Sequence, residues 1–428
     1  MLKAEIPGKR YHQQTKHSYL SVSLDPNYVD ASTQPSCYKS YPQFYPRFPL
    51  NSDRKVENLI RLSSQITFEK TYGKSCYQLR VNPSAGALYP TELYVQIRGV
   101  QGLIDGIYHV EVARNSLTLI YQLIDDGVED YILPNYWVKG LIILVSCVYF
   151  RSSWKYKDRS LRYCFLDAGH HLGAVEAAAY LENQDLQLYF DFDKRSLNQD
   201  FGFENQEFIT AAAIIGELKE KPTRRLRSPI PFVCGTDYFE ANSIVEAGYK
   251  ETLSPYSFHQ TWKKPEFYYE PKKFLEVVFK RRSARKFQQQ SITYEDWMRI
   301  LNVLEQPIPS VSFEAIEIYA VVHRVLNLTP GIYRGTQLIK AGDFREKTGY
   351  LCINQALGRE SAVTLFFVSD YQNYQTAIQW AGLIGQRLYL VSHYLNLGCS
   401  GIGAYYDDET QAFLETDKDV LYALVIGQ

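Results

Sequence analysis

Several kinds of sequence signal are scarce in this chain of 428 residues. Its seven cysteines include no Cys-x-x-Cys pair, which gives zinc and dithiol sites little support. The longest apolar run, 141–150, is about half a membrane span and is typical of a buried strand. The N-terminus has no apolar stretch of signal-peptide length. A net charge of −1 offers no bulk attraction to nucleic acid or an acidic membrane. We therefore expect a cytoplasmic protein with reduced thiols, no metal, and neither nucleic acid nor membrane as partner.

What the chain does contain is ordinary globular composition with many aromatic rings. Its length exceeds what one hydrophobic core usually supports, so two domains are the default expectation. The 35 tyrosines and 22 phenylalanines suit pockets for flat rings or grooves for peptides, although tyrosine is also common on plain surfaces.

Composition divides the chain into four parts. Residues 1–50 are polar, aromatic and interrupted by prolines, and we interpret them as an extended arm; its His12, Lys16 and His17 are more typical of a hydrogen-bonded surface than of catalysis. Residues 51–218 form a first domain, 219–270 a linker rich in charge and proline, and 271–428 a second domain.

The second domain restates the first. Four short segments recur in the same order: 106–109 with 331–334, 141–146 with 362–368, 167–169 with 380–382, and 214–216 with 425–427. Their shared order predicts a duplicated domain rather than a solenoid, because the period is a whole domain.

The stretch Asn82-Pro-Ser-Ala-Gly-Ala-Leu-Tyr-Pro90 is the most specific feature. Its prolines restrict φ, and its middle is nearly bare backbone that lets a flat ligand approach closely. Continued through Thr91-Glu-Leu-Tyr94, it resembles the signature of SagB-type dehydrogenases. These are FMN oxidoreductases of the nitroreductase superfamily, associated with oxidising thiazolines and oxazolines in peptides to azoles. The resemblance implies an α+β fold: two tandem nitroreductase-like domains, each a mostly antiparallel sheet flanked by helices, forming a pseudo-dimer within one chain.

The same resemblance implies one FMN site that uses both halves. In the second half, Lys280-Arg-Arg-Ser-Ala-Arg-Lys-Phe287 offers forked, permanently charged donors, and 397–405 is rich in glycine. The first half lacks counterparts of both, and the second-half counterpart of the signature, 307–312, lacks Gly-Ala-Leu-Tyr. The implied contacts are Arg281, Arg282, Ser283 and Arg285 to the phosphate, Gly401, Ile402 and Gly403 beside the ring, and Pro83, Ser84, Ala85, Gly86, Ala87 and Leu88 as the partner-side wall.

The resemblance assigns catalysis to Lys155 and Tyr156, in a stretch (153–163) that matches the family's Lys-Tyr and Arg-x-x-Arg-Tyr motifs. Neither side chain is a good base at neutral pH, but a dry pocket lowers the pKa of a lysine and an adjacent ammonium lowers that of a tyrosine. A solvated basic loop is the alternative. Asp-Ala-Gly-His follows at 167–170, where a structural role for His170 and His171 is favoured, and 172–176 departs from the family by lacking its glutamine.

Three functions remain open from the sequence. The first is FMN-dependent dehydrogenation of azolines in a modified peptide or carrier-bound intermediate, by hydride transfer to FMN. The second is an NAD(P)H-dependent nitroreductase acting on small acceptors. The third is a non-catalytic scaffold in a biosynthetic complex. The expected partners are a peptide or small-molecule substrate and other biosynthetic proteins, with the chain a monomeric pseudo-dimer or a further homodimer.

Overall fold

The computed structural model describes residues 6–25, 29–72, 75–203, 205–253, 262–310 and 314–428. The chain divides into two compact units. The signature unit, which contains residues 82–90, comprises Val29–Pro265 and Pro307–Phe313. The arginine unit, which contains residues 280–287, comprises Met1–Tyr28, Glu266–Gln306 and Glu314–Gln428. Each is described by itself.

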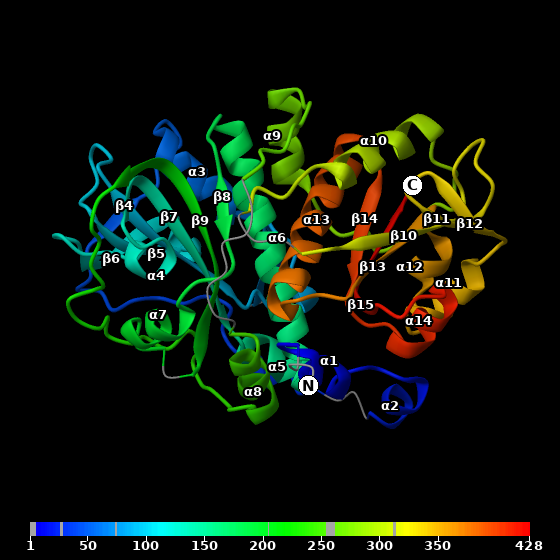
Figure 1. Ribbon diagram of the computed structural model, residues 1–428, viewed down its shortest axis with the longest axis horizontal. Helices are drawn as coiled ribbons and strands as arrows, with labels where there is room; N and C mark the ends of the chain where they lie inside the picture. The colour runs from blue at the N-terminus through cyan, green and yellow to red at the C-terminus, as the bar shows by residue number, and fades with distance from the viewer. Residues whose placement is uncertain (1–5, 26–28, 73–74, 204, 254–261, 311–313) are drawn as a thin grey trace, which may run out of the picture. The chain divides into compact units, whose positions relative to one another are not determined.

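The signature unit is built on an antiparallel seven-stranded sheet with the order β1-β6-β5-β4-β7-β9-β8 (Figure 1). Its strands are β1 (Arg47–Pro49), β4 (Thr91–Arg98), β5 (Gly106–Glu111), β6 (Ser116–Gln122), β7 (Tyr136–Val148), β8 (Gln187–Tyr189) and β9 (Glu207–Glu220). A separate hairpin joins β2 (Ile66–Tyr72) to β3 (Ser75–Arg80). The predicted buried strand is confirmed, since residues 141–148 lie buried in β7 between β4 and β9.

Helices cover this sheet. They are α3 (Lys55–Ser64), α4 (Glu129–Ile132), α5 (Phe150–Tyr156), α6 (Ser160–Leu181), α7 (Lys194–Asp200) and α8 (Ser243–Glu251). The long helix predicted over 161–181 is confirmed as α6, and it contacts β4, β7 and β9. Every residue of α6 from Ser160 to Ala179 is buried, including the charged or polar side chains of Arg162, Asp167 and Glu176, so the helix is enclosed on all sides.

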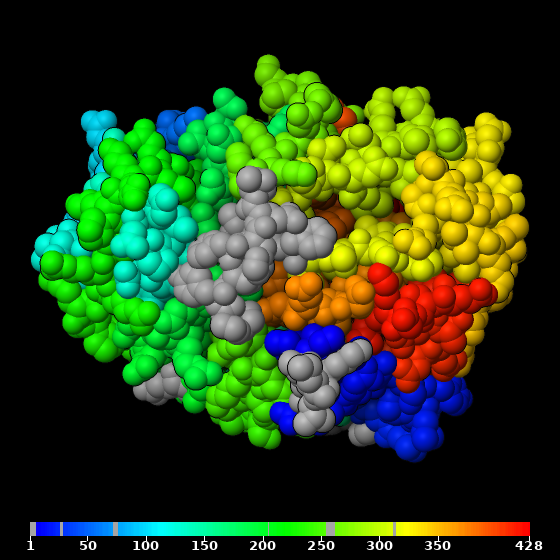
Figure 2. Space-filling view, in the orientation of Figure 1, coloured from blue at the N-terminus to red at the C-terminus, as the bar shows by residue number. Residues whose placement is uncertain are grey.

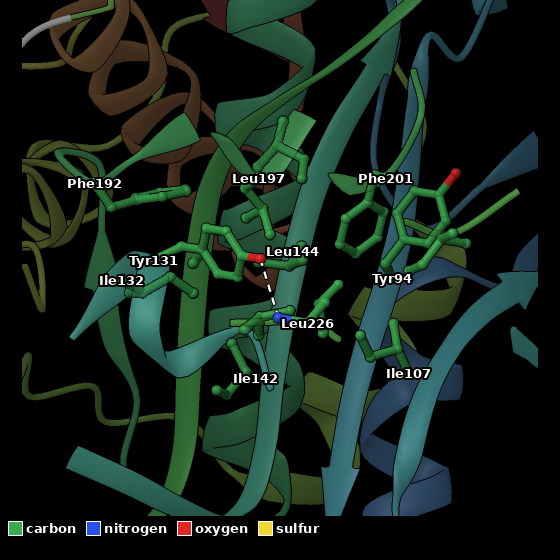
Figure 3. Close-up of a cluster of buried hydrophobic side chains, with 14 of the residues drawn as sticks. Tyr94, Ile107, Tyr131, Ile132, Ile142, Leu144, Phe192, Leu197, Phe201 and Leu226 are labelled. Carbon is green, nitrogen blue, oxygen red and sulfur yellow. Dashed lines mark hydrogen bonds between the residues drawn. The ribbon is translucent and has the colours of Figure 1, made fainter. Parts of the chain in front are cut away.

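One core cluster of the signature unit joins strands to α4 and α7 (Figure 3). It includes Ile142 and Leu144 of β7 together with Leu197 of α7. The hydroxyl of Tyr131 reaches the edge of this cluster and accepts the backbone N–H of Leu226 at 3.1 Å. The segment expected to be a linker therefore contributes Leu226 to this core.

The arginine unit has a six-stranded antiparallel sheet with the order β12-β11-β10-β13-β15-β14 (Figure 1). Its strands are β10 (Glu317–Val322), β11 (Gly331–Arg334), β12 (Gln337–Ala341), β13 (Val363–Ser369), β14 (Gly398–Ile402) and β15 (Asp419–Gly427). Its helices after the N-terminal segment are α9 (Pro271–Lys280), α10 (Tyr294–Glu305), α11 (Arg345–Leu351), α12 (Ala356–Glu360), α13 (Tyr374–Tyr394) and α14 (Asp407–Leu414).

The two sheets have the same topology. The order β6-β5-β4-β7-β9-β8 in one corresponds strand by strand to β12-β11-β10-β13-β15-β14 in the other. The four repeated sequence segments fall in β5 and β11, β7 and β13, α6 and α13, and β9 and β15. The predicted fold class, with duplicated domains of antiparallel sheet and helices, is thereby confirmed.

The N-terminal segment differs from an extended arm. Its described residues form α1 (Lys9–Gln14) and α2 (Tyr19–Leu24), where Ser18 and Ser21 cap the start of α2 reciprocally. Lys9 pairs with the buried carboxylate of Asp419, and His12 lies 3.6 Å from it. Figure 2 shows this segment on the surface beside the C-terminal part of the same unit, where Lys16 reaches Asp408 at 2.8 Å. Its cations thus hold the segment against the C-terminal part of the arginine unit.

In the described ranges, all seven cysteines are free thiols and no cluster of three His, Cys, Asp or Glu residues is arranged to bind a metal. None of the described helices combines the length and apolar character needed to cross a bilayer.

Candidate functional site

The signature loop has an unusual backbone. After a 3-10 turn at Ala85–Ala87, it enters β4 at Thr91. Gly86, Ala87 and Tyr89 all have positive φ, at 63°, 56° and 45°. For residues with a side chain, this conformation costs roughly 1–3 kcal/mol each, so the surroundings must hold the loop in place.

Asp167 of α6 holds the start of the loop. Its carboxylate accepts the Ser84 hydroxyl at 2.5 Å and the Ala85 N–H at 3.2 Å. The Ser84 oxygen in turn accepts the Tyr89 N–H at 2.8 Å. Burial raises the pKa of Asp167 to about 7, although the two hydrogen bonds oppose the rise.

A buried ion cluster holds the end of the loop. Arg151 of α5 donates to the Tyr89 carbonyl at 2.9 Å and pairs with Glu92 of β4 at 2.6 Å. His109 of β5 lies 2.9 Å from the other oxygen of Glu92. Burial alone would raise the pKa of Glu92, but Arg151 and His109 hold it well below its usual range. The loop is therefore anchored from the sheet as well as from α6.

Lys155 and Tyr156 lie at the tip of this loop. They end α5, and the Tyr156 ring stacks on Tyr163 of α6 with centroids 4.1 Å apart. A Cβ placed on Gly86 would lie 2.8 Å from the Tyr156 hydroxyl and 3.4 Å from the Lys155 Nζ. A side chain there would displace the Tyr156 hydroxyl and would also be strained at the φ of 63°, so two motifs some seventy residues apart in sequence lie close together.

The accessible part of the loop is its tip. Gly86 is exposed, and Ser84, Ala85 and Ala87 are partly exposed, whereas Pro83 and Leu88 are buried. Lys155 is exposed, so the dry pocket expected around it is not formed by the described residues. His170 and His171 are buried in α6, and His171 lies 2.9 Å from the Thr91 hydroxyl, which fits the structural role favoured for it.

In the arginine unit, Tyr389 of α13 connects the two predicted cofactor stretches. Its hydroxyl lies 2.9 Å from the Ser283 hydroxyl and accepts the Gly401 N–H at 2.8 Å. The buried Arg281 places its guanidinium 5.3 Å from the Tyr389 ring centroid. The residues expected at the phosphate and those expected at the ring thus share one support.

Individual residues of these stretches have different surroundings. Arg282 donates from Nη1 to the carbonyls of Phe279, at 3.1 Å, and Arg281, at 2.5 Å, which caps the end of α9. Arg285 is exposed. At Gly401 a Cβ would lie 1.9 Å from the Tyr422 hydroxyl, so packing inside the unit already requires glycine there.

The donor set of the arginine unit fits a phosphate. Two arginines, Arg281 and Arg285, flank the Ser283 hydroxyl within five residues, and such permanently charged donors suit phosphate oxygens. Ile402 is buried, while Gly401 and Gly403 are partly exposed. Of the second-half counterpart of the signature, residues 307–310 are described, and Val311 and Ser312 lie outside the described residues.

Sequence reasoning assigned no role to three side chains that organise these stretches. Asp167 belongs to the Asp-Ala-Gly-His motif at 167–170, and its charge alone does not distinguish it from Arg162 and Glu176 of the same helix. Tyr389 and Arg151 stand among many similar residues, and their partners are distant in sequence, so nothing in the pattern distinguishes them.

Comparison with known proteins agrees with this fold. The "Nitroreductase family" sequence model matches residues 278–428. A protein of Methanocaldococcus jannaschii named "putative nitroreductase" is 29% identical over 24% of this chain, and the chain spans 59% of that protein's length. The crystal structure of a "putative nitroreductase" from Anabaena variabilis matches 99% of both chains with a TM-score of 0.82 and 24% identity. Residues 278–428 therefore match the model of this family, within a chain whose fold is similar to that of the Anabaena variabilis protein over nearly its whole length.

Proposed function

We propose that the chain is an FMN-dependent oxidoreductase that dehydrogenates azoline rings in a modified peptide or carrier-bound intermediate. The observation that carries the proposal is the meeting of the Tyr156 hydroxyl and Lys155 ammonium with Gly86 at the tip of the signature loop. Both motifs resemble those of SagB-type enzymes, and their proximity supports a common role.

Conversion of an azoline to an azole removes a proton from carbon together with a hydride. FMN, when bound, would supply the hydride acceptor. The chain must supply a group that takes the proton, and Tyr156 and Lys155 are the candidates at the exposed loop tip. The stack of Tyr156 on Tyr163 fixes the ring plane and so limits the directions in which its hydroxyl can point.

The arginine unit would hold the cofactor. Arg281, Ser283 and Arg285 supply donors for the phosphate, and Arg282 shapes the same turn by capping α9. The signature loop would provide the partner-side wall, so we propose one FMN per chain that uses residues of both units.

The test is oxidation of a thiazoline-containing peptide by the flavin-loaded protein. Tyr156→Phe and Lys155→Met should each lower the rate about 10²–10⁴-fold, the usual contribution of a positioned proton-transfer group. Lys157→Met is the matched control, since Lys157 is exposed next to the pair. Full activity of both variants with FMN still bound would overturn the catalytic assignment.

A nitroreductase activity is the second candidate, favoured by the names of both relatives. In that case, NAD(P)H would reduce a small nitro or quinone acceptor, and Tyr156→Phe would leave the rate unchanged. A purified protein that binds no FMN would instead favour a scaffold in a biosynthetic complex. We propose a cytoplasmic setting for all three functions.

A further inference from the structure

Asp167 is the contact through which α6 controls the signature loop. Its side chain is 3% exposed, and it accepts hydrogen bonds from both Ser84 and Ala85. Because the Ser84 oxygen also accepts the N–H of Tyr89, one carboxylate fixes residues at both ends of the turn.

The position of the loop tip depends on this anchor. Ala87 and Tyr89 have positive φ, a conformation that residues with a side chain rarely adopt. Without its anchor, the backbone would relax toward ordinary φ values and carry Gly86 with it. Gly86 lies beside Tyr156 and Lys155, since a Cβ added to it would be 2.8 Å from the Tyr156 hydroxyl and 3.4 Å from the Lys155 Nζ, so whatever fixes the turn also fixes the space beside these two side chains.

We propose that Asp167 is a positioning residue that holds the signature loop against Tyr156 and Lys155, and that closure of this loop takes up a proton on Asp167. Treating Tyr156 and Lys155 as the reacting pair rests on the proposed function. The anchoring rests on hydrogen bonds within the signature unit, and the proton uptake rests on the burial of the Asp167 carboxyl in that unit.

The direction of the proton linkage follows from burial. In the closed loop burial raises the pKa of Asp167 to about 7, against 3.8 for a carboxyl in water, which an open loop would restore. The loop faces it with Ser84 and Ala85, and the Cys147 thiol of β7 interacts with it electrostatically. The closed form keeps its proton to higher pH than the open form. The equilibrium constant for loop closure should therefore fall by up to about tenfold per pH unit between about pH 4 and 7, and should be constant above about pH 7.

Hydrogen exchange of the peptides that cover residues 82–90 tests the inference without any substrate. After correction for the intrinsic rate, protection in the wild type should fall by up to about tenfold per pH unit between about pH 5 and 7, then level off. In Asp167→Asn the profile should be flat. An unchanged pH profile in this variant would overturn the proposal.

Asp126→Asn is the matched control. Asp126 is another buried acid of the same unit that holds a turn, through the Ile124 and Arg227 N–H groups. It should leave the exchange of 82–90 as in the wild type, and an equal effect on this loop would contradict a specific role of Asp167. If Asp167→Asn raises exchange throughout the protein, Ser84→Ala serves instead: it removes a hydrogen bond to the protonated carboxyl and should lower protection of the loop alone by about 2–13-fold at pH 5, the worth of a neutral hydrogen bond.

Activity and exchange separate the two proposals. Tyr156→Phe should abolish azoline oxidation and leave the exchange profile of the loop unchanged. Loss of the expected azoline activity with an intact pH profile would refute the proposed function alone. A flat wild-type profile with normal activity would refute the role of Asp167 alone.

Discussion

Helices α6 and α13 occupy equivalent places in their units and serve different site elements. They carry the repeated segments 167–169 and 380–382, so that Asp167 corresponds to Trp380 and Glu176 to Tyr389. Asp167 holds the signature loop, and Tyr389 joins Ser283 to Gly401. Each helix thus has one polar side chain that holds a site element of its own unit, and the other helix has a different residue at the equivalent position.

The difference shows how duplicated domains can diverge without a change of topology. The strand order is kept, because each sheet still needs its buried central strands and its long helix. Asp167 and Tyr389 are both buried, yet each bonds partners in its own unit, so polar side chains on this helix can differ while the topology is kept. A division of labour between the two proposed halves of a cofactor site is the expected result.

The largest expected effect is a loss of FMN affinity when a charged residue of the arginine unit is removed. Arg285→Ala should weaken FMN binding about 10–150-fold, because hydrogen bonds to charged groups are worth about 1.5–3 kcal/mol. Equilibrium titration of the apoprotein with FMN measures the change. Lys286→Ala, which removes the neighbouring exposed charge, is the control and should bind FMN nearly as the wild type does; equal losses would indicate general charge attraction rather than a phosphate contact.

Gly401→Ala sharpens the comparison through packing. The added Cβ meets the Tyr422 hydroxyl, and overpacking of this kind costs roughly 1–3 kcal/mol of unfolding free energy. The arginine unit should therefore unfold at a lower temperature than in the wild type. Tyr422→Phe in the same chain should recover part of the loss, whereas no recovery would mean that Tyr422 is not what requires the glycine.

Tyr389→Phe should affect only the arginine unit. The change leaves the Gly401 N–H and the Ser283 hydroxyl without this partner, at a cost of about 1–3 kcal/mol. FMN affinity should fall as well, because Ser283 loses its orientation. Glu176→Gln at the equivalent position of α6 should leave FMN affinity unchanged, and a comparable drop there would break the comparison.

The last prediction concerns two buried acids that hold opposite ends of one loop and should depend on pH in opposite directions. The pKa of Glu92 is depressed, so its contribution to stability is present above about pH 4.5 and is lost as pH falls through the folded pKa. The pKa of Asp167 is raised, so its contribution is present below about pH 3.8 and is lost as pH rises toward about 7. Compared with the wild type, the unfolding temperature should depend less on pH below about pH 4.5 in Glu92→Gln. In Asp167→Asn it should depend less on pH between about pH 4 and 7. Loss of pH dependence in the same pH range for both variants would contradict these assignments.

The sequence predicted the elements that depend on local pattern. The apolar run of β7, the periodicity of α6 and the four repeated segments all reflect the burial of contiguous residues, so they are visible without the structure. The anchors are different in kind. The bonds from Asp167 to Ser84 and from Tyr389 to Gly401 join residues far apart in sequence or on separate elements, and no spacing rule encodes them. The exposure of Lys155 likewise depends on three-dimensional packing rather than on its neighbours in sequence.

The central proposal is that the chain binds one FMN with residues of both halves, and the stoichiometry of bound flavin tests it directly. Visible absorbance of the FMN-saturated protein, divided by protein concentration from amino-acid analysis, should give one FMN per chain, and Arg281→Ala should abolish it. Two FMN molecules per chain, or one that persists in Arg281→Ala, would contradict the account.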